Sequence, residues 1–318
     1  MKLKKLDEKI LHVLDGNARK TFSQISRDVG LSKERVRYRI RAFEDDNFLL
    51  SSYAIVDYSK LSLQMYKVYL KLQHTTVKNE KKLIQFIKKE LSLVTIIRCD
   101  GVFEIVFLTL CDHPIKLYDM FMKLKSEFGS ILLRKEIHPV VYFHRSIFRT
   151  HKKSIVFFGN SKPCKKYPLT PLKKHLLQKL SVNARTSAVD LSKDVYRSAK
   201  NVAENIKHLE RDGFIVGYGV HINLIQLGWV KVILNISLQD GSASERIMSY
   251  FQKKGILRFS HLLTGFYDLS LELWVEDLVE YRLALLNFKK HFSSFYSFYD
   301  VLFVLEEDFI GFRPYFDE

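Results

Sequence analysis

Apolar residues in the first 50 positions recur every three or four residues, which is the spacing of helices that bury one face. We expect three helices, the second capped by Thr21 or Ser23 and the third by Ser32. Their inward residues are Leu6, Ile10, Leu11, Leu14, Phe22, Ile25, Val29, Val36, Ile40 and Phe43. Gly30 suits the sharp turn before the third helix, because glycine reaches the left-handed backbone. An extended run over residues 53–56 suits a wing strand, so the pattern predicts a winged helix-turn-helix.

The next 80 or so residues change to a mixed pattern of strands and helices. The order strand, helix, strand, strand, helix, strand is expected at 66–72, 79–90, 94–99, 103–110, 115–128 and 131–143. The same order recurs at 231–238, 244–254, 259–263, 267–274, 278–292 and 298–305. The run from Asp268 to Leu273 alternates polar and apolar residues, which predicts a sheet with one solvated face. This order is that of the ferredoxin-like fold, an α+β class that hosts many functions.

The chain repeats itself with a period of about 165 residues, too long for the unit of a solenoid. Residues 6–50 align onto 172–216 without a gap, with 15 identities in 45 positions. Asn17-Ala18-Arg19 recurs as Asn183-Ala184-Arg185, and Asp100 to Ile105 parallels Thr264 to Leu269. Between the copies, Arg145 to Lys166 holds seven basic residues and no acid, as an inter-repeat linker could. Its apolar run 155–158 can form a short strand.

Charge is the compositional feature that changes this picture. The chain of 318 residues has 51 Lys and Arg against 35 Asp and Glu, a net charge of +16. Such a surplus favours an anionic partner such as DNA, RNA or an acidic membrane surface, although it can also be only solvated. Residues 51–144 carry +5 and residues 217–318 carry −4, so the two mixed units could pair through opposite charges.

Other classes of protein find little support. The three cysteines (Cys99, Cys111 and Cys164) form no C-x-x-C pair, so we expect reduced thiols in a cytoplasmic protein, with no disulfide framework and no metal site. The sequence shows no signal peptide and no apolar stretch long enough for a membrane. No catalytic triad or glycine-rich phosphate loop stands out. We therefore expect no enzyme activity, no cofactor and no membrane partner.

The third predicted helix carries the strongest candidate site, a cationic face for the major groove of double-stranded DNA. One lysine and four arginines lie between Lys33 and Arg41, whereas a lone arginine on a helix is usually just solvated. The proposed DNA contacts are Ser32, Lys33, Arg35, Arg37, Tyr38 and Arg41. Arg39 lies beside the buried face and could instead pair with Glu44 or another acid.

The second copy departs from the first at the turn and on the third helix. Tyr196 stands where the first copy has Gly30, so this turn is either strained or reshaped. The candidate DNA contacts here are Ser198, Lys200 and Asn201. Asn201 and Asn205 could read adenine, but Glu204 would repel phosphate. The second helix-turn-helix could bind DNA specifically, contact only its backbone, or support the first.

The order and spacing of these motifs resemble the Lrp/AsnC (leucine-responsive, feast/famine) family of transcriptional regulators, here in tandem. The resemblance rests on Leu6-Asp7 with Ile10-Leu11, Asn17-Ala18-Arg19, Val29 to Ser32, Val36 with Arg39-Ile40, and the turn Gly101-x-Phe103-Glu104. Lys9 and Glu104 depart from that family's pattern, whereas Asp268 keeps it. The implied domains are a winged helix-turn-helix at 1–56 and 169–222, a ferredoxin-like sensing domain at 57–148 and 223–318, and a basic linker at 149–168.

The resemblance implies a sequence-specific DNA-binding regulator that senses an amino acid or a similar small effector and self-associates through its sensing domains. The effector would bind near the Gly-x-aromatic-acid turns, at Gly101, Phe103, Glu104, Gly265, Tyr267 and Asp268. The two glycines can equally serve only as tight turns. Because a duplicated module carries its own two-fold partner, we also expect the two sensing domains to pack as a pseudo-dimer within one chain.

Two other functions share this architecture. Siroheme decarboxylases combine the same two domains and would need a histidine and arginine cluster around a tetrapyrrole. The residues available are His138, His144, Arg145, Arg258 and His261, but they form no dense motif in the sequence. The other alternative is an architectural protein that binds nucleic acid without sequence choice, which the same basic surface would allow.

Overall fold

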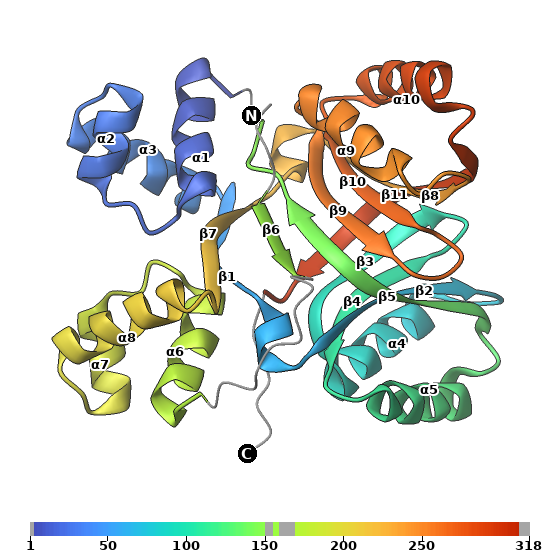
Figure 1. The fold of residues 1–318 in the computed structure, drawn as a ribbon, viewed down its shortest axis with the longest axis horizontal. Coiled ribbons are helices and arrows are strands. Elements are labelled where there is room, and N and C mark those ends of the chain that lie inside the picture. Colours follow the sequence, from blue (N-terminus) through green and yellow to red (C-terminus); the bar gives the residue numbers. More distant parts are fainter. Residues whose placement is uncertain (1–2, 150–154, 159–168, 312–318) are drawn as a thin grey trace.

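The computed structural model describes residues 3–149, 155–158 and 169–311. Two small helical units lie on one side of the molecule, a barrel of strands with four helices lies on the other, and a two-stranded ribbon lies between them (Figure 1). None of the helices within these described ranges has the length and apolarity needed to span a membrane.

The three helices of each helical unit lie where the hydrophobic pattern predicts them. In the first repeat they are α1 Lys5–Gly16, α2 Phe22–Val29 and α3 Lys33–Asp45. In the second repeat they are α6 Pro171–Val182, α7 Ala188–Val195 and α8 Ala199–Arg211. Thr21 caps α2 and Ser32 caps α3, each through a side-chain oxygen that accepts a backbone N–H at 3.2 Å. Gly30 joins them with the left-handed backbone that the turn requires (φ +71°).

The second turn is strained rather than reshaped. Tyr196 ends α7 with φ +51° and ψ +43°, the left-handed conformation that Gly30 adopts in the first copy. A side chain with a Cβ pays about 1–2 kcal/mol for this backbone. The tyrosine ring offsets none of that cost by burial, because the residue is 94% exposed.

Each mixed unit has the predicted order of elements. The first unit has β2 Gln64–Leu72, α4 Val77–Glu90, β3 Ser92–Gly101, β4 Ile105–Cys111, α5 Pro114–Phe128 and β5 Leu132–Arg145. The second has β8 Val230–Leu238, α9 Ala243–Lys253, β9 Leu257–Leu263, β10 Leu269–Val275, α10 Leu278–Phe292 and β11 Tyr296–Phe309. Short 3₁₀ turns, η1 Tyr58–Leu61 and η2 Ile225–Leu227, lead into β2 and β8.

The two four-stranded sheets close into one barrel, which confirms the predicted intrachain pseudo-dimer. The strand order is β2-β4-β3-β11-β8-β10-β9-β5, and β5 also pairs with β2 to complete the circle. The seams between repeats are β3 with β11 and β5 with β9, both antiparallel. The predicted charge complementarity appears at the first seam, where Lys88 binds Asp308 at 2.6 Å and Arg98 binds Glu306 at 2.8 Å.

The barrel overturns the prediction of a solvated sheet face. The apolar residues of β10 pack under α9 and α10, as the alternating pattern indicates. Its polar residues Ser270 and Glu272 point the other way and are nevertheless buried, because that face lines the barrel interior. Alternation in a single strand cannot reveal this, because it does not tell whether the polar face meets water or a second sheet.

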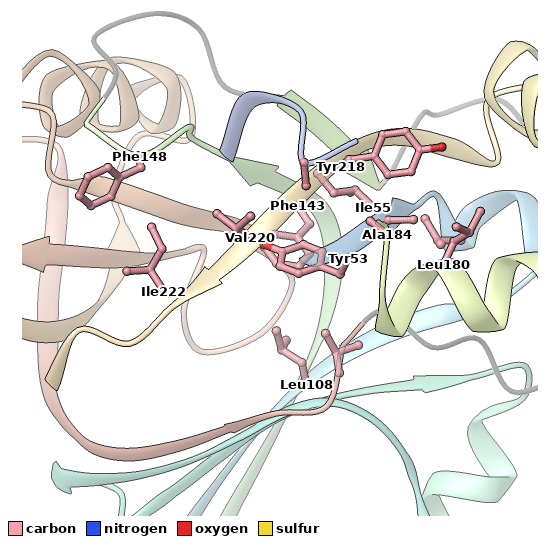
Figure 2. Packing of buried hydrophobic residues seen from close by; sticks show 14 of the residues in the cluster. Tyr53, Ile55, Leu108, Phe143, Phe148, Leu180, Ala184, Tyr218, Val220 and Ile222 are labelled. Atoms are coloured by element: carbon pink, nitrogen blue, oxygen red, sulfur yellow. The ribbon is translucent and has the colours of Figure 1, made fainter. Parts of the chain in front are cut away.

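The predicted wing strands exist, but each pairs with the other repeat instead of forming a hairpin of its own. Strand β1 Leu49–Val56 runs antiparallel to β7 Ile215–Ile222, and Tyr53 lies opposite Gly219. Since these two positions are 166 residues apart, each is the repeat equivalent of the other, and a pseudo-two-fold axis passes between them. In Figure 2, Tyr53 and Ile55 of β1 and Val220 and Ile222 of β7 join one apolar core with Leu180 and with barrel residues such as Phe143.

The repeat offset allows each residue to be matched with its equivalent. It is 166 through the helix-turn-helix, the ribbon and the first barrel strand, and 164 from the second barrel strand onward. Two backbone contacts verify both values: Leu72 donates its N–H to the carboxylate of Glu104, and Leu238 donates to that of Asp268, each at 2.7 Å.

The basic segment from Arg145 to Lys166 is not linker at its first residue. Arg145 is the last residue of β5 and is completely buried, so it is not part of a solvated basic segment. Its guanidinium and that of Arg258 both bind the buried carboxylate of Asp15 in α1. The apolar run 155–158 forms the predicted short strand, β6, and it pairs with β5. Residues 150–154 and 159–168 of the expected linker, including Cys164, lie outside the described residues.

Candidate nucleic-acid interface

Helix α3 presents its cationic side chains to solvent. The predicted contacts Ser32, Lys33, Arg35, Arg37, Tyr38 and Arg41 are all exposed. Tyr38 is 70% exposed although it is aromatic. Among the described residues, the lysine and these three arginines form no ion pair. This face of α3 is therefore free to approach an anionic surface.

The opposite side of α3 fixes the helix in place. Val36, Ile40 and Phe43 are buried against α1 and α2, as the helical spacing predicts. Arg39 donates from its Nε to the buried carboxylate of Asp7 at 2.8 Å and covers the ring of Phe43. Its partner is thus another acid than Glu44, and its role is structural. The Ser32 cap and the free backbone N–H groups of the first turn complete a helix N-terminus that favours phosphate.

Helix α8 has lost most of this cationic face. The positions equivalent to Lys33, Arg35 and Arg37 are Ala199, Asn201 and Ala203, and only the pair Arg41 and Lys207 keeps its charge. Ser198, Lys200 and Asn201 are exposed as predicted, with Ser198 capping the helix. Asn205 donates its side-chain amide to the backbone oxygen of Asn201 at 2.9 Å.

Three cations elsewhere in the second helical unit are bound to acids. Lys193 binds Asp190 at 3.0 Å and Lys179 binds Asp194 at 2.8 Å. Arg211, at the end of α8, binds Asp212 at 3.1 Å. An exposed cationic face on the third helix is therefore a feature of the first unit.

The repeated Asn-Ala-Arg motif clasps the two helical units together, a role that the sequence analysis did not assign. Arg19 donates to the carbonyl oxygens of Ala184 and Thr186, at 2.5 and 3.3 Å. Arg185 donates in return to those of Ala18 and Lys20, at 2.7 and 3.3 Å. Retention of the motif in both copies was the signal available in the sequence. The clasp fixes the distance between the two helical units.

The residues predicted to bind an effector hold the sensing turns in shape. The Glu104 and Asp268 carboxylates accept the backbone N–H groups named above, and Phe103 and Tyr267 are each 1% exposed. Gly101 and Gly265 have φ near +145°. A Cβ on Gly265 would lie 2.6 Å from the His138 ring. Tight turns therefore account for both glycines.

The two turns nevertheless meet at one end of the barrel. The Arg134 guanidinium lies over the ring of Phe103 at 5.5 Å and over that of Phe266 at 5.6 Å, so it bridges the repeats. Its side chain is 53% exposed and binds Glu136. The effector assignment stays a prediction, to which the structure adds Arg134, a residue that sequence reasoning missed.

The residues that the decarboxylase alternative would need all lie on the adjacent strands β5 and β9, although they contact different partners. Arg145 and Arg258 are bound to Asp15 near the helical units. His138 stacks on Tyr267 and its Nε2 is hydrogen-bonded to the Glu136 carboxylate at 3.1 Å, while His261 stacks on Phe143. Burial lowers the pKa of His138 and that of His261. In the described part of the chain, no group of three or more His, Cys, Asp or Glu residues could hold a metal ion.

Comparison with known proteins shows which domains and relatives the chain is similar to. Residues 3–44 match the AsnC-type helix-turn-helix domain, and residues 169–216 match a winged helix-turn-helix DNA-binding domain. The leucine-responsive regulatory protein of Klebsiella pneumoniae is 34% identical over 117 residues, which are 36% of this chain and 71% of that protein. That of Serratia marcescens is 32% identical over 127 residues, 39% of this chain and 76% of the other.

A solved structure resembles the whole chain. The siroheme decarboxylase NirDL aligns with a TM-score of 0.63 over 96% of this chain and 92% of its own. At 14% identity this likeness shows a shared fold alone. The relatives with closer sequences are regulators, and both helix-turn-helix units are recognised. The chain therefore belongs to the Lrp/AsnC family of DNA-binding transcriptional regulators and carries that family's module twice.

Proposed function

We propose that α3 is the principal DNA-reading helix of this regulator and that α8 makes a weaker, mainly supporting contact. The observation that carries this proposal is the unequal charge of two helices that are otherwise equivalent. Lys33, Arg35, Arg37 and Arg41 are exposed without acidic partners, whereas three of the four equivalent positions on α8 are uncharged. The DNA site would then consist of one strongly read half and one weakly read half.

The experiment exchanges residues between the two helices. Arg35→Asn and Arg37→Ala give α3 the side chains of α8, and Asn201→Arg and Ala203→Arg make the reverse exchange. Binding is measured by fluorescence anisotropy on DNA that the wild-type chain selects from a random pool, over a salt series. Arg282→Ala with Lys290→Ala, two exposed cations on α10, is the matched control.

The α3 exchange should weaken specific binding by about 100-fold or more, because a good bidentate contact contributes about 1–3 kcal/mol. If both arginines neutralise phosphates, the slope of log K against log salt should also become less steep by about 0.9 for each. The α8 exchange should strengthen binding. Unchanged affinity and salt dependence in the α3 exchange would overturn the proposal, and equal binding to selected and scrambled DNA would favour an architectural protein.

We also propose that a small carboxylate-bearing effector, of which an amino acid is the expected class, binds where the two sensing turns meet. The supporting observation is Arg134, whose half-exposed guanidinium lies between the exposed Val102 and Phe266 turns. Calorimetric titration with a panel of amino acids tests it. Arg134→Met should abolish any binding found, whereas Lys290→Ala should not.

The proposed regulator also self-associates through its sensing domains, and we assign this role to the outer faces of α5 and α10. Exposed apolar side chains follow one face of each helix: Ile115, Tyr118 and Met122 on α5, and Val279, Leu283 and Leu286 on α10. Large exposed apolar patches on soluble proteins mark interaction sites. We propose no enzymatic activity, and added siroheme should therefore give no absorption band of a bound tetrapyrrole.

A further inference from the structure

Each third helix carries a single acidic residue before its last turn, Glu34 in α3 and Glu204 in α8. Both side chains are exposed. A residue two positions away from another lies about 200° around a helix. Glu34 therefore lies opposite the buried Val36, and Glu204 lies opposite the buried Val202. Both carboxylates thus stand on the outermost line of their helix, which is the line that would enter a groove most deeply.

The two carboxylates are also unpaired. Among the residues that the structure describes, neither Glu34 nor Glu204 forms an ion pair or accepts a hydrogen bond with its side chain. Arg37 and Lys207 lie three positions further on, within reach of an ion pair. The same spacing does give an ion pair at 3.0 Å in α7. A free carboxylate on this line repels the phosphates of DNA, so its presence on a DNA-binding helix calls for a favourable contact of its own.

The two acids occupy different positions on equivalent helices. With the repeat offset of 166, Glu34 corresponds to Lys200, and Glu204 corresponds to Tyr38. Both helices are capped by a serine whose side chain accepts a backbone N–H at 3.2 Å, and the reciprocal arginine clasp holds both units. The pseudo-two-fold axis therefore relates the two helices but not their acids, so each half presents its carboxylate to a different base pair.

The chemistry of the major groove indicates which base a carboxylate selects. Cytosine presents only the N4 amino donor there, whereas guanine, adenine and thymine each present at least one acceptor that would repel a carboxylate. An acid in the first turn also favours the helix dipole, which gives Glu34 a structural benefit. Glu204 lies in the middle of α8 and has no such benefit. The contact with a base explains both residues.

We propose that Glu34 and Glu204 each select a cytosine, at two positions that the two-fold axis of the DNA site does not relate. This inference rests on the proposed function, in which α3 and α8 both contact DNA. The DNA site would then depart from a palindrome at these two base pairs. The cations of α3 would supply most of the affinity, and the two carboxylates would supply selectivity in both halves.

The experiment compares the DNA selected by different variants of the full chain. The wild type, Glu34→Gln and Glu204→Gln each select duplexes from a random pool, and the selected duplexes are sequenced. Glutamine keeps the shape of glutamate but pairs with adenine. Glu44→Gln, at an exposed acid in the last turn of α3 next to the buried Phe43, is the matched control. Fluorescence anisotropy then measures wild-type binding to selected duplexes in which one base pair at a time is replaced.

We expect Glu34→Gln to change the preferred base from cytosine to adenine at one position and to leave the other positions unchanged. Glu204→Gln should do the same in the other half, at a position that the two-fold axis does not relate to the first. Replacing either cytosine should weaken wild-type binding about tenfold, because a hydrogen bond to a charged group is lost. Tyr38→Glu, which copies α8 onto α3, should add a cytosine preference at the position that the axis relates to the one read by Glu204.

Two other results would overturn the proposal. If the glutamine variants bound all sequences more tightly with unchanged base preference, the carboxylates would only repel phosphate. If the preferences changed at positions that the two-fold axis relates, the two acids would not read different base pairs. Arg35→Asn with Arg37→Ala is measured on the same duplexes. Unchanged binding of that exchange would contradict the proposed function, whereas weaker binding with unchanged preferences in the glutamine variants would contradict this inference alone.

Discussion

At the scale of single residues, the two inter-helix turns form an internal comparison. The sequence predicts the turn in both copies, and it predicts that Tyr196 would be strained or would reshape the backbone. Which of these occurs could not be predicted, because it depends on how firmly α7 and α8 are held by their cores. Leu191, Val202 and Ile206 are buried, and this packing holds the tyrosine in a conformation that glycine adopts without cost.

Replacing Tyr196 by glycine should therefore stabilise the protein. We expect Tyr196→Gly to raise the free energy of unfolding by about 0.5–1 kcal/mol. The energy gained by removing the left-handed strain exceeds the entropic stabilisation that glycine gives to the unfolded chain. Gly30→Ala should lower it by about 1 kcal/mol for the reverse reason. Urea unfolding measures both. Gly241→Ala, at a glycine with ordinary φ and open surroundings, should stay within about 0.5 kcal/mol. No gain for Tyr196→Gly would mean that its backbone relaxes at no cost.

Lys67 is a second residue whose state follows from its surroundings. It is completely buried in the barrel, and burial lowers its pKa to about 7. In the unfolded chain the lysine keeps its proton up to about pH 10.5. Protonated Lys67 therefore lowers the free energy of unfolding below pH 7, and this destabilisation disappears as the pH rises towards 10. Lys67→Ile installs the residue of the equivalent position, Ile233.

The variant should be more stable than the wild type at pH 6, by up to several kcal/mol at about 1.4 kcal/mol per pKa unit. The advantage should shrink steadily between pH 7 and pH 10. Urea unfolding of both proteins across this pH range gives the difference between their free energies of unfolding. The contributions of other titrating groups cancel in that difference. A parallel Lys290→Ile variant, at an exposed lysine, should show no such trend. A constant difference would show that Lys67 keeps its proton in the folded state.

At the scale of elements, helices and strands could be predicted well and their partners could not. The start of α3 and the bounds of α5 and α10 fall within one or two residues of those expected, because each depends on local periodicity and on caps such as Ser32. The polar face of β10 and the pairing of β1 with β7 depend on segments far away in the chain. No local pattern distinguishes a polar face in water from one inside a barrel. The cationic face of α3 could be predicted because none of the residues that the structure describes covers it.

The ion cluster around Asp15 ties α1 to the barrel and is the clearest element-level contact that sequence reasoning missed. Burial by itself raises the pKa of Asp15, but Arg145 and Arg258 hold it below its ordinary value. The folded-state pKa is thus depressed, so the cluster stabilises the protein above about pH 4, and that stabilisation is lost as the pH falls further. The equivalents of Asp15 and Arg258 are Ser181 and Val94, so only one half of the molecule has this cluster.

Asp15→Ser should lower the free energy of unfolding by about 3–5 kcal/mol, because it leaves two arginines buried without their carboxylate. The double variant Asp15→Ser with Arg258→Val copies the other half of the molecule and should recover part of the loss. Urea unfolding at pH 7 measures both. At pH 3 the difference in free energy of unfolding between the wild type and Asp15→Ser should be smaller than at pH 7. If the double variant lost as much stability as Asp15→Ser and Arg258→Val lose separately when added together, the residues would not act as one cluster.

At the scale of the whole molecule, duplication has converted a symmetric pair of modules into one chain with unequal halves. The fold stays close to two-fold symmetric, as the reciprocal bonds of Arg19 and Arg185 show. The chemistry differs between the halves, since α3 carries four exposed cations of which α8 keeps only Lys207 at the equivalent positions. Because both halves belong to one chain and pack in a fixed geometry, they can differ in function.

The outer helices α5 and α10 keep one common property, an apolar exposed face, and this predicts assembly beyond one chain. Each molecule offers two such faces, one per repeat, so contacts between copies can extend on both sides. We expect the wild-type chain to sediment as a species larger than a monomer. Ile115→Glu with Met122→Glu on α5, combined with Leu283→Glu and Leu286→Glu on α10, should give a monomer whose thermal unfolding is little changed.

Altering one face at a time shows how the copies meet. If α5 of one chain packs on α10 of the next, either pair of substitutions alone should give monomers, because every contact uses both faces. If like packs on like, either pair should leave dimers. Sedimentation velocity separates these results, and Lys81→Glu with Lys82→Glu on α4, two charged surface positions, is the control. If the wild-type chain stayed monomeric at high micromolar concentration, the assignment of α5 and α10 to self-association would be wrong. The apolar faces would then not bind another copy of the chain.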